Sequence, residues 1–151
     1  MSQPSVTWTS QQKTAITQRD RDLLVTASAG TGKTAVLSQR CLDILCEPNT
    51  QTSVLNMLIL TFTDAAAREM RTRIREQLME VVTQDRRLHH LQKELWLLPA
   101  ARISTIHSFC KQVITEHFHT LGLDPGFRLI DTDEQRLLKT EALEQRVTPM
   151  I

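Results

Sequence analysis

The residues with the clearest chemistry are Gly32, Lys33 and Thr34, which follow a loop of small side chains near the N-terminus. Residues 27–34 read ASAGTGKT, which matches the pattern GxxxxGK followed by Ser or Thr, except that Ala27 replaces the first glycine. In such a loop, successive backbone N–H groups converge on an anion, and the N-terminus of the next helix adds positive potential. Lys33 would reach the β- and γ-phosphates of a nucleotide, and the Thr34 hydroxyl would ligate Mg²⁺. The simpler alternative is a glycine-containing turn before a helix.

The sequence therefore predicts a nucleotide site in which Lys33 and Thr34 are catalytic and Thr34 is the metal ligand. The loop residues expected to bind the nucleotide are Ala27, Ser28, Ala29, Gly30, Thr31, Gly32, Lys33 and Thr34. Because alanine lacks free access to positive φ, we expect residue 27 to adopt a conformation that alanine tolerates. Upstream, the amide of Gln12 can donate to one adenine nitrogen and accept from the exocyclic amine. A solvent-facing helix residue is the simpler interpretation of Gln12 alone.

A second candidate site follows the apolar run at 57–60, where Thr61, Phe62 and Thr63 come in succession. Open α/β sheets bind ligands at the carboxyl ends of their strands. The threonines and the first N–H groups of the next helix could hold a backbone phosphate there. Phe62 could stack on an unpaired base, an interaction worth about 1–3 kcal/mol. Ordinary core packing is a slightly better interpretation of Phe62 taken alone.

A third segment repeats this arrangement, since a brief strand at 102–104 is followed by Thr105 and His107. Both side chains could donate to a phosphodiester from the N-terminus of the next helix. Taken singly, a capped helix with a surface histidine explains the segment better.

Hydrophobic periodicity predicts strands that alternate with helices, which is typical of an α/β fold with a parallel sheet and right-handed crossovers. The strands are expected at 23–27, 57–62, 102–104 and 127–130. The helices are expected at 9–18, 33–46, 64–82, 85–97, 105–119 and from 132 onward. Thr9 is the expected cap of the first helix, and Thr132 with Gln135 is the expected capping box of the last. Three arginines that share one face of the 64–82 helix are expected to be solvated: Arg68, Arg71 and Arg75.

The composition of the 151 residues, 40% of them hydrophobic, fits one domain with a real core. The net charge of +1 gives no global field that would attract nucleic acid or a membrane. Cys41, Cys46 and Cys110 have spacings that suit neither zinc nor a disulfide framework, and Cys41 and Cys110 fall on helical apolar stripes. Reduced thiols, a polar N-terminus and the lack of a long apolar run predict a cytoplasmic protein with no membrane partner.

Taken in order, segments 8–16, 27–34, 60–74 and 104–109 resemble the start of a UvrD/Rep-type superfamily 1 DNA helicase. Within that family, the chain is most similar to the AddA and RecB subunits of bacterial helicase–nucleases. The sequence DPGFRL at 124–129 favours the AddA group. The resemblance covers nearly the whole chain, and the four ordered motifs make it specific.

The resemblance implies a P-loop NTPase (RecA-like) lobe, with a parallel sheet flanked by helices, that binds ATP, Mg²⁺ and single-stranded DNA. It matches Gln12 to the adenine-reading glutamine of the family and residues 27–34 to its Walker A loop, where an initial alanine is common. The DNA-facing motifs match Thr61, Phe62, Thr63, Thr105 and His107. Asp64 departs from the asparagine that relatives often carry, and Ala35 replaces a basic residue of the Rep-like branch.

The resemblance also implies that the motor is incomplete in this chain. Residues 1–126 match a partial helicase ATP-binding lobe, and residues 127–151 match the start of an inserted helical subdomain. The DExQ segment that holds Mg²⁺ and orients water is absent, and the acidic pair Asp133 and Glu134 is interpreted as part of a helix cap. We expect a fragment of a 3′–5′ helicase/exonuclease subunit of recombinational repair, without helicase activity of its own. The relative would pair with an AddB-like second subunit.

Two other functions remain open. A small P-loop kinase acting on a metabolite would suit the length, but would leave segments 60–74 and 104–109 unexplained. A non-catalytic regulatory module that retains the nucleotide site would also lack the catalytic groups.

Overall fold

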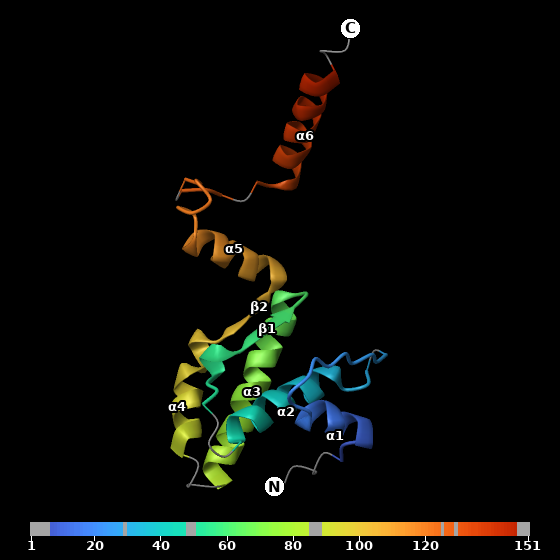
Figure 1. Ribbon diagram of the computed structural model, residues 1–151, viewed down its shortest axis with the longest axis vertical. Helices are drawn as coiled ribbons and strands as arrows, with labels where there is room; N and C mark the ends of the chain where they lie inside the picture. Colours follow the sequence, from blue (N-terminus) through green and yellow to red (C-terminus); the bar gives the residue numbers. More distant parts are fainter. Residues whose placement is uncertain are drawn as a thin grey trace. The chain divides into compact units, whose positions relative to one another are not determined.

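The computed structural model describes residues 7–28, 30–47, 51–84, 89–124, 126–128 and 130–147. The chain forms two compact units, Met1–Cys110 and Lys111–Ile151. Figure 1 shows the order of the elements along the chain. The predicted domain division between residues 126 and 127 stays a prediction.

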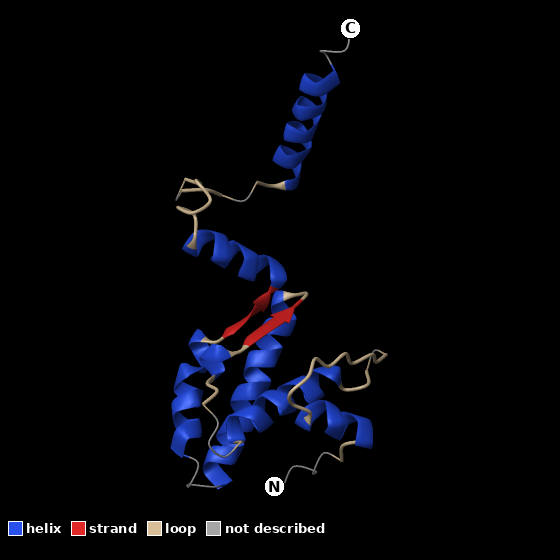
Figure 2. Cartoon of the chain, viewed as in Figure 1, coloured by secondary structure: helices blue, strands red, loops and turns tan. Residues whose placement is uncertain are grey.

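The described part of the first unit contains a parallel sheet of two strands (Figure 2). Strand β1 is Leu58–Thr61 and strand β2 is Arg102–Thr105. Leu58 lies opposite Arg102, and Thr61 lies opposite Thr105. This arrangement confirms the predicted strands at 57–62 and 102–104. It also brings the carboxyl ends of both strands, where the second and third candidate segments begin, to the same edge.

Helices provide the crossover that parallel strands require. The connection consists of α3 (Asp64–Gln84), α4 (His89–Leu97) and the 3₁₀ helix η2 (Leu98–Ala100). The helix predicted at 64–82 is confirmed, and α3 buries Ala67, Met70, Ile74 and Leu78 on one face. These side chains form one core with residues of the sheet, of α4 and of η2, including Ile59, Leu91, Leu98 and Ile103.

The sheet is covered on one face. Ile59 is 6% exposed, whereas Leu58 and Leu60 are 46% and 38% exposed. Side chains alternate between the two faces of a strand, so the face that carries Ile59 packs on the core and the other face is open. The apolar run at 57–60 therefore belongs to a strand that is buried on one face only.

A buried carboxylate anchors the segment that leads into β1. The 3₁₀ helix η1 (Val54–Asn56) begins after Ser53. The Glu94 carboxylate on α4 accepts from the Ser53 hydroxyl at 2.8 Å and from the Val54 N–H at 2.7 Å. Glu94 is 7% exposed, and these bonds compensate its burial.

The helices that flank the phosphate-loop segment match their predictions. Helix α1 (Ser10–Thr17) begins after the expected cap, Thr9, and α2 (Lys33–Cys46) has the predicted bounds. The two helices pack on each other, and α2 also packs on α3 (Figure 1). The C-terminal part of α2 contributes Cys41, Leu42 and Leu45 to the main core.

The predicted strand at 23–27 is wrong, because residues 22–28 are irregular. Leu24 is 89% exposed and Val25 is 48% exposed. A strand is stable only when its N–H and C=O groups pair with a neighbour. No other described residue pairs with this segment in a sheet.

The second unit contains the end of α5 (Ile106–Glu116), a set of turns, and α6 (Thr132–Val147). The predicted strand at 127–130 is not formed by residues 126–128 and 130, and Leu129 lies outside the described residues. The predicted helix from 132 is confirmed, but its capping box lies one residue earlier. The Asp131 carboxylate accepts from the Glu134 N–H at 2.8 Å, and the Glu134 carboxylate accepts from the Asp131 N–H at 3.3 Å. Asp is at least as good a helix cap as Thr, and this pair replaces Thr132 and Gln135.

Candidate functional site

The phosphate loop has the backbone geometry that its glycines allow. Gly30 and Gly32 have φ of 78° and 83°, and Gly32 is the N-cap of α2. A side chain at either position would strain the backbone by about 1–2 kcal/mol. Ala27 is not among the described residues with positive φ, which meets the expectation that alanine fits the start of the loop. The predicted Ala29 lies outside the described residues.

Lys33 folds back over the loop. Its Nζ donates to the Ala27 carbonyl at 2.7 Å and to the Ser28 carbonyl at 2.6 Å. The Thr31 hydroxyl donates to the same Ser28 carbonyl at 2.7 Å. Because an ammonium group has three donors, Lys33 has one donor left for a ligand. Both Lys33 and Thr34 are exposed at the start of α2, so a phosphate could approach them.

The residues present fit a triphosphate with its metal, but only in part. Two positive-φ glycines, a lysine and an exposed threonine hydroxyl at a helix N-terminus are the groups such a loop requires. For Mg²⁺, Thr34 would be a single protein ligand. The described residues contain no cluster of three or more His, Cys, Asp or Glu side chains that could hold a metal by themselves.

Gln12 lies on α1 and contacts this loop. Its Oε1 accepts from the Thr9 N–H at 2.9 Å, and its Nε2 donates to the Thr31 carbonyl at 3.3 Å. These two bonds determine the orientation of the amide, that is, the positions of its oxygen and its nitrogen. An amide has two donors and two acceptor lone pairs. One donor and one acceptor therefore remain, which is the pair that an adenine edge requires.

A pocket of about 310 Å³ lies between α1 and the loop. It is lined on one side by Thr9, Gln11, Gln12 and Ala15, and on the other by Val25, Thr26, Ala27, Thr31, Lys33 and Val36. A polar amide, an ammonium group and apolar walls thus surround one cavity. This combination suits a ligand with a flat base and an anionic tail.

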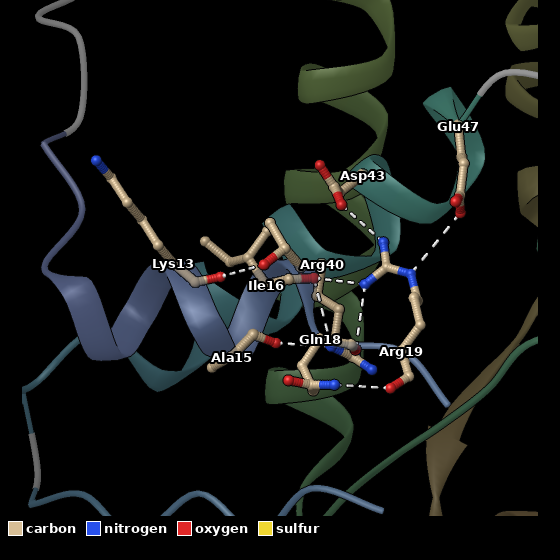
Figure 3. A network of polar contacts seen from close by, with 9 residues as sticks. Lys13, Ala15, Ile16, Gln18, Arg19, Arg40, Asp43 and Glu47 are labelled. Atoms are coloured by element: carbon tan, nitrogen blue, oxygen red, sulfur yellow. Dashed lines mark hydrogen bonds and ion pairs between the residues drawn. The ribbon is translucent and has the colours of Figure 1, made fainter. Parts of the chain in front are cut away.

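Polar contacts dock α1 on α2 (Figure 3), and a small apolar cluster joins the two helices as well. Ala15, Ile16 and Val36 are buried together, with Trp8 packed against them. Arg19 forms an ion pair with Asp43 at 2.6 Å. Arg40 donates to the Ala15 carbonyl at 2.8 Å. None of the three charged residues was singled out from the sequence; only the position of Arg40, two turns after Lys33 on the same helix face, could have pointed to it.

The second candidate site lies at the carboxyl edge of the sheet. Thr61 and Thr105 are register partners, so the two predicted DNA-facing segments are brought together. The Thr61 hydroxyl donates to the Thr63 carbonyl at 2.9 Å. The Thr63 hydroxyl accepts from the Ala66 N–H at 3.1 Å and thereby caps α3. Their hydroxyl groups therefore shape the turn that carries residue 62.

Phe62 is 92% exposed at this edge. The interpretation of Phe62 as a core residue is therefore wrong. An aromatic ring presented to solvent at a strand end, among backbone N–H groups and hydroxyls, is suited to stack on a base.

The two predicted residues of the third segment differ in exposure, since Thr105 is buried and His107 is exposed. Thr105 is 7% exposed, and its hydroxyl accepts from the Ser108 N–H at 3.1 Å and donates to the Ser108 hydroxyl at 2.9 Å. Thr105 therefore caps α5, and a DNA contact by its side chain stays a prediction. His107 is exposed in the first turn of α5, next to the edge that carries Phe62.

One arginine of the expected solvated face is part of the fold. Arg71 donates to the Ala101 carbonyl at 3.2 Å and to the Ile103 carbonyl at 3.0 Å, and it is half-buried. Arg68 and Arg75 are exposed, as expected. The three arginines line a pocket of about 370 Å³ with Thr72, Leu98 and Pro99.

Comparison with known proteins identifies the class to which this fold and these segments belong. The chain matches the UvrD/REP helicase N-terminal domain over residues 8–150, and it belongs to that family. Its curated relatives include the AddA subunit of the ATP-dependent helicase/nuclease from Pelotomaculum thermopropionicum, which is 47% identical over 138 residues. The corresponding proteins from Desulforamulus reducens and from Thermoanaerobacter sp. are 44% and 46% identical over 138 residues. Each alignment covers 91% of this chain and 11% of the relative, so the chain spans about a tenth of the length of these relatives.

The expected membership in the UvrD/Rep family, on its AddA side, is therefore confirmed. In addition, none of the described helices is long and apolar enough to cross a membrane.

Proposed function

We propose that this chain is an ATP- and single-stranded-DNA-binding N-terminal portion of an AddA-type ATP-dependent 3′–5′ DNA helicase/nuclease subunit. The observation that carries this proposal is the phosphate loop. It has two positive-φ glycines, the Lys33 ammonium donates to its Ala27 carbonyl, and the Gln12 amide donates to its Thr31 carbonyl. Family membership and the relatives named as helicase/nuclease subunits support it. The cytoplasmic location stays a prediction.

The residues of the chain have separate parts in nucleotide binding. Lys33 would exchange its bonds to the Ala27 and Ser28 carbonyls for bonds to the β- and γ-phosphates. Gln12 would donate to one adenine nitrogen and accept from the exocyclic amine, with the donor and the acceptor that its present contacts leave over. Thr34 would hold Mg²⁺, which would offset the negative charge of the phosphates.

DNA would lie along the carboxyl edge of the sheet. The exposed Phe62 ring offers a stacking surface, and the helix N-termini beside it offer N–H groups to the phosphates. His107, which is exposed in the first turn of α5, would donate to a phosphate. In this arrangement, Thr61, Thr63 and Thr105 hold the backbone that presents the contacts.

We propose further that the chain binds ATP without turnover. Phosphoryl transfer needs a carboxylate for Mg²⁺, a carboxylate or amide to orient water, and a cation for the transition state. In the family that the chain resembles, these groups belong to motifs that this sequence lacks. Hydrolysis coupled to movement along DNA, and pairing with an AddB-like subunit, would belong to the full-length relative.

Calorimetry with ATP and Mg²⁺ tests the nucleotide site. The chain is expected to bind ATP, and Lys33→Ala is expected to lose about tenfold or more in affinity because a charge-assisted contact to phosphate is removed. Equal ATP affinity in the two proteins would refute the site.

The same preparations decide between the functions. Binding without turnover, with or without DNA, supports the proposed portion of a motor. DNA-stimulated hydrolysis would show a complete ATPase, and phosphate transfer that is independent of DNA would show a metabolite kinase. Binding of an oligothymidylate is measured in parallel, to distinguish the helicase portion from a regulatory module. Only the helicase portion is expected to bind DNA.

A further inference from the structure

The end of α1 is bound by a side chain of α2. The last carbonyls of a helix have no partner within the helix. In α1, the guanidinium Nη1 of Arg40 donates to the Ala15 carbonyl at 2.8 Å and to the Ile16 carbonyl at 3.3 Å. A cation at a helix C-terminus also interacts favourably with the helix dipole. Arg40 therefore caps a helix to which it does not belong.

A second arginine binds the same end of α1 (Figure 3). Arg19, just beyond α1, donates to the Ile16 carbonyl at 2.7 Å and to the Asp43 carboxylate at 2.6 Å. Helix α2 thus supplies a cation, Arg40, and an anion, Asp43, to the same end of α1. Both arginines are partly buried, which strengthens such contacts compared with exposed pairs.

One face of α2 serves both this contact and the phosphate loop. Lys33, Val36 and Arg40 follow one another at spacings of three and four residues, so they share a helix face. Lys33 and Arg40 are about 10 Å apart along the helix axis, because each residue rises about 1.5 Å. On α1, Gln12, Ala15 and Ile16 share the facing side in the same way. The two helices therefore link the position of Gln12 to that of Lys33.

We propose that Arg40 is a positioning residue that sets the base selectivity of the nucleotide site, because it holds α1, and with it the Gln12 amide, at a fixed place over the phosphate loop. This inference rests on the proposed function of the loop. The amide is already oriented by Thr9 and Thr31, so its remaining acceptor faces a donor on the base. Adenine carries an amine at that edge, whereas hypoxanthine carries a carbonyl oxygen. When α1 shifts, this discrimination is lost, while the phosphates are still held by Lys33.

Arg40→Met tests the role with three probes: ATP, ITP and inorganic tripolyphosphate. The variant removes the guanidinium and keeps an unbranched apolar stem. Its ATP affinity is expected to fall about tenfold, while the affinities for ITP and tripolyphosphate stay within about twofold. The preference for ATP over ITP should therefore disappear. Arg73→Met is the matched control, because Arg73 pairs with Glu69 within α3 and should leave all three affinities unchanged.

A double-mutant cycle shows whether Arg40 acts through Gln12. Gln12→Ala alone should reproduce the loss of selectivity, and the double variant should be no worse than either single variant, because coupled residues are not additive. Arg40→Lys, which keeps the charge and can still donate to a carbonyl, should restore part of the selectivity. Circular dichroism establishes that each variant is folded. Should Arg40→Met unfold, Arg40→Lys is compared with the unmodified chain instead, and a smaller loss of selectivity is then expected.

Several outcomes overturn the assignment. An unchanged ATP-to-ITP ratio in Arg40→Met, or additive losses in the double variant, would remove Arg40 from base selection. A parallel loss of tripolyphosphate binding would give Arg40 a purely structural role. If the unmodified chain binds neither ATP nor tripolyphosphate, the proposed function fails instead. Lys33→Ala distinguishes failure of the nucleotide site from failure of the Arg40 proposal, since this variant should weaken binding of both ATP and tripolyphosphate.

Discussion

Replacing Phe62 with alanine is expected to weaken binding of single-stranded DNA and to leave the fold intact. The ring is 92% exposed, so it buries almost no apolar surface in the folded chain. Surface substitutions of this kind change the free energy of unfolding by less than about 0.5 kcal/mol. A stacked base contributes about 1–3 kcal/mol. Since about 1.4 kcal/mol corresponds to a tenfold change, the dissociation constant should rise by about 5- to 150-fold.

Fluorescence anisotropy of a labelled oligothymidylate measures this change. The salt concentration must be held constant, because phosphate contacts make the affinity strongly salt-dependent. Trp96→Ala is the matched control: this residue is also a large aromatic, is 85% exposed, and lies on α4 away from the carboxyl edge of the sheet. The control should bind DNA like the unmodified chain.

Two outcomes would contradict the prediction for Phe62. If Phe62→Ala and Trp96→Ala bind the oligonucleotide equally, exposure of the ring is unrelated to DNA. If Phe62→Ala lowers the urea midpoint by as much as a core substitution would, the ring is packed in solution and the assignment of residue 62 is wrong.

Two further results are expected. Arg71→Ala should lower the free energy of unfolding by about 1–3 kcal/mol in urea, because it removes the guanidinium that donates to the carbonyls of Ala101 and Ile103. Arg68→Ala should change the free energy of unfolding by less than about 0.5 kcal/mol, and equal effects of the two substitutions would contradict the structural role of Arg71. Burial raises the pKa of the Cys41 thiol to about 11, so this thiol stays protonated at pH 8 in the folded chain. Mass spectrometry should therefore show that iodoacetamide labels the exposed Cys110 well before Cys41. Labelling of Cys41 first would show that α2 is not packed as described.

Local signals predicted the helices well. The bounds of α2 follow from a glycine before Lys33 and from the apolar stripe after it, and both signals lie within the segment. The core face of α3 follows from the spacing of its apolar residues. The parallel pairing of β1 and β2 follows from the alternation of strands with helices.

Predictions that depend on a distant partner were less successful. An apolar run marks a strand but does not supply the neighbour it pairs with, so residues 23–27 remained irregular. Cys110 lies on an apolar stripe that the described residues leave exposed. Arg71 and Arg40 donate to backbone carbonyls of other segments, and any residue type offers such an acceptor. No side-chain pattern therefore marks the contact of Arg71 in the sequence, and only the spacing of Arg40 from Lys33 points to the other contact.

The connection between β1 and β2 has a consequence for how this chain reaches its native state. Residues 62–101 separate the two strands, so the strands meet only after a long loop has closed, at an entropic cost that local contacts must offset. Helices α3 and α4 are adjacent in sequence and pack on each other, and they can form before that closure. We expect the helical hairpin to assemble early, and the strands to zip together late, on the surface that the hairpin has already prepared.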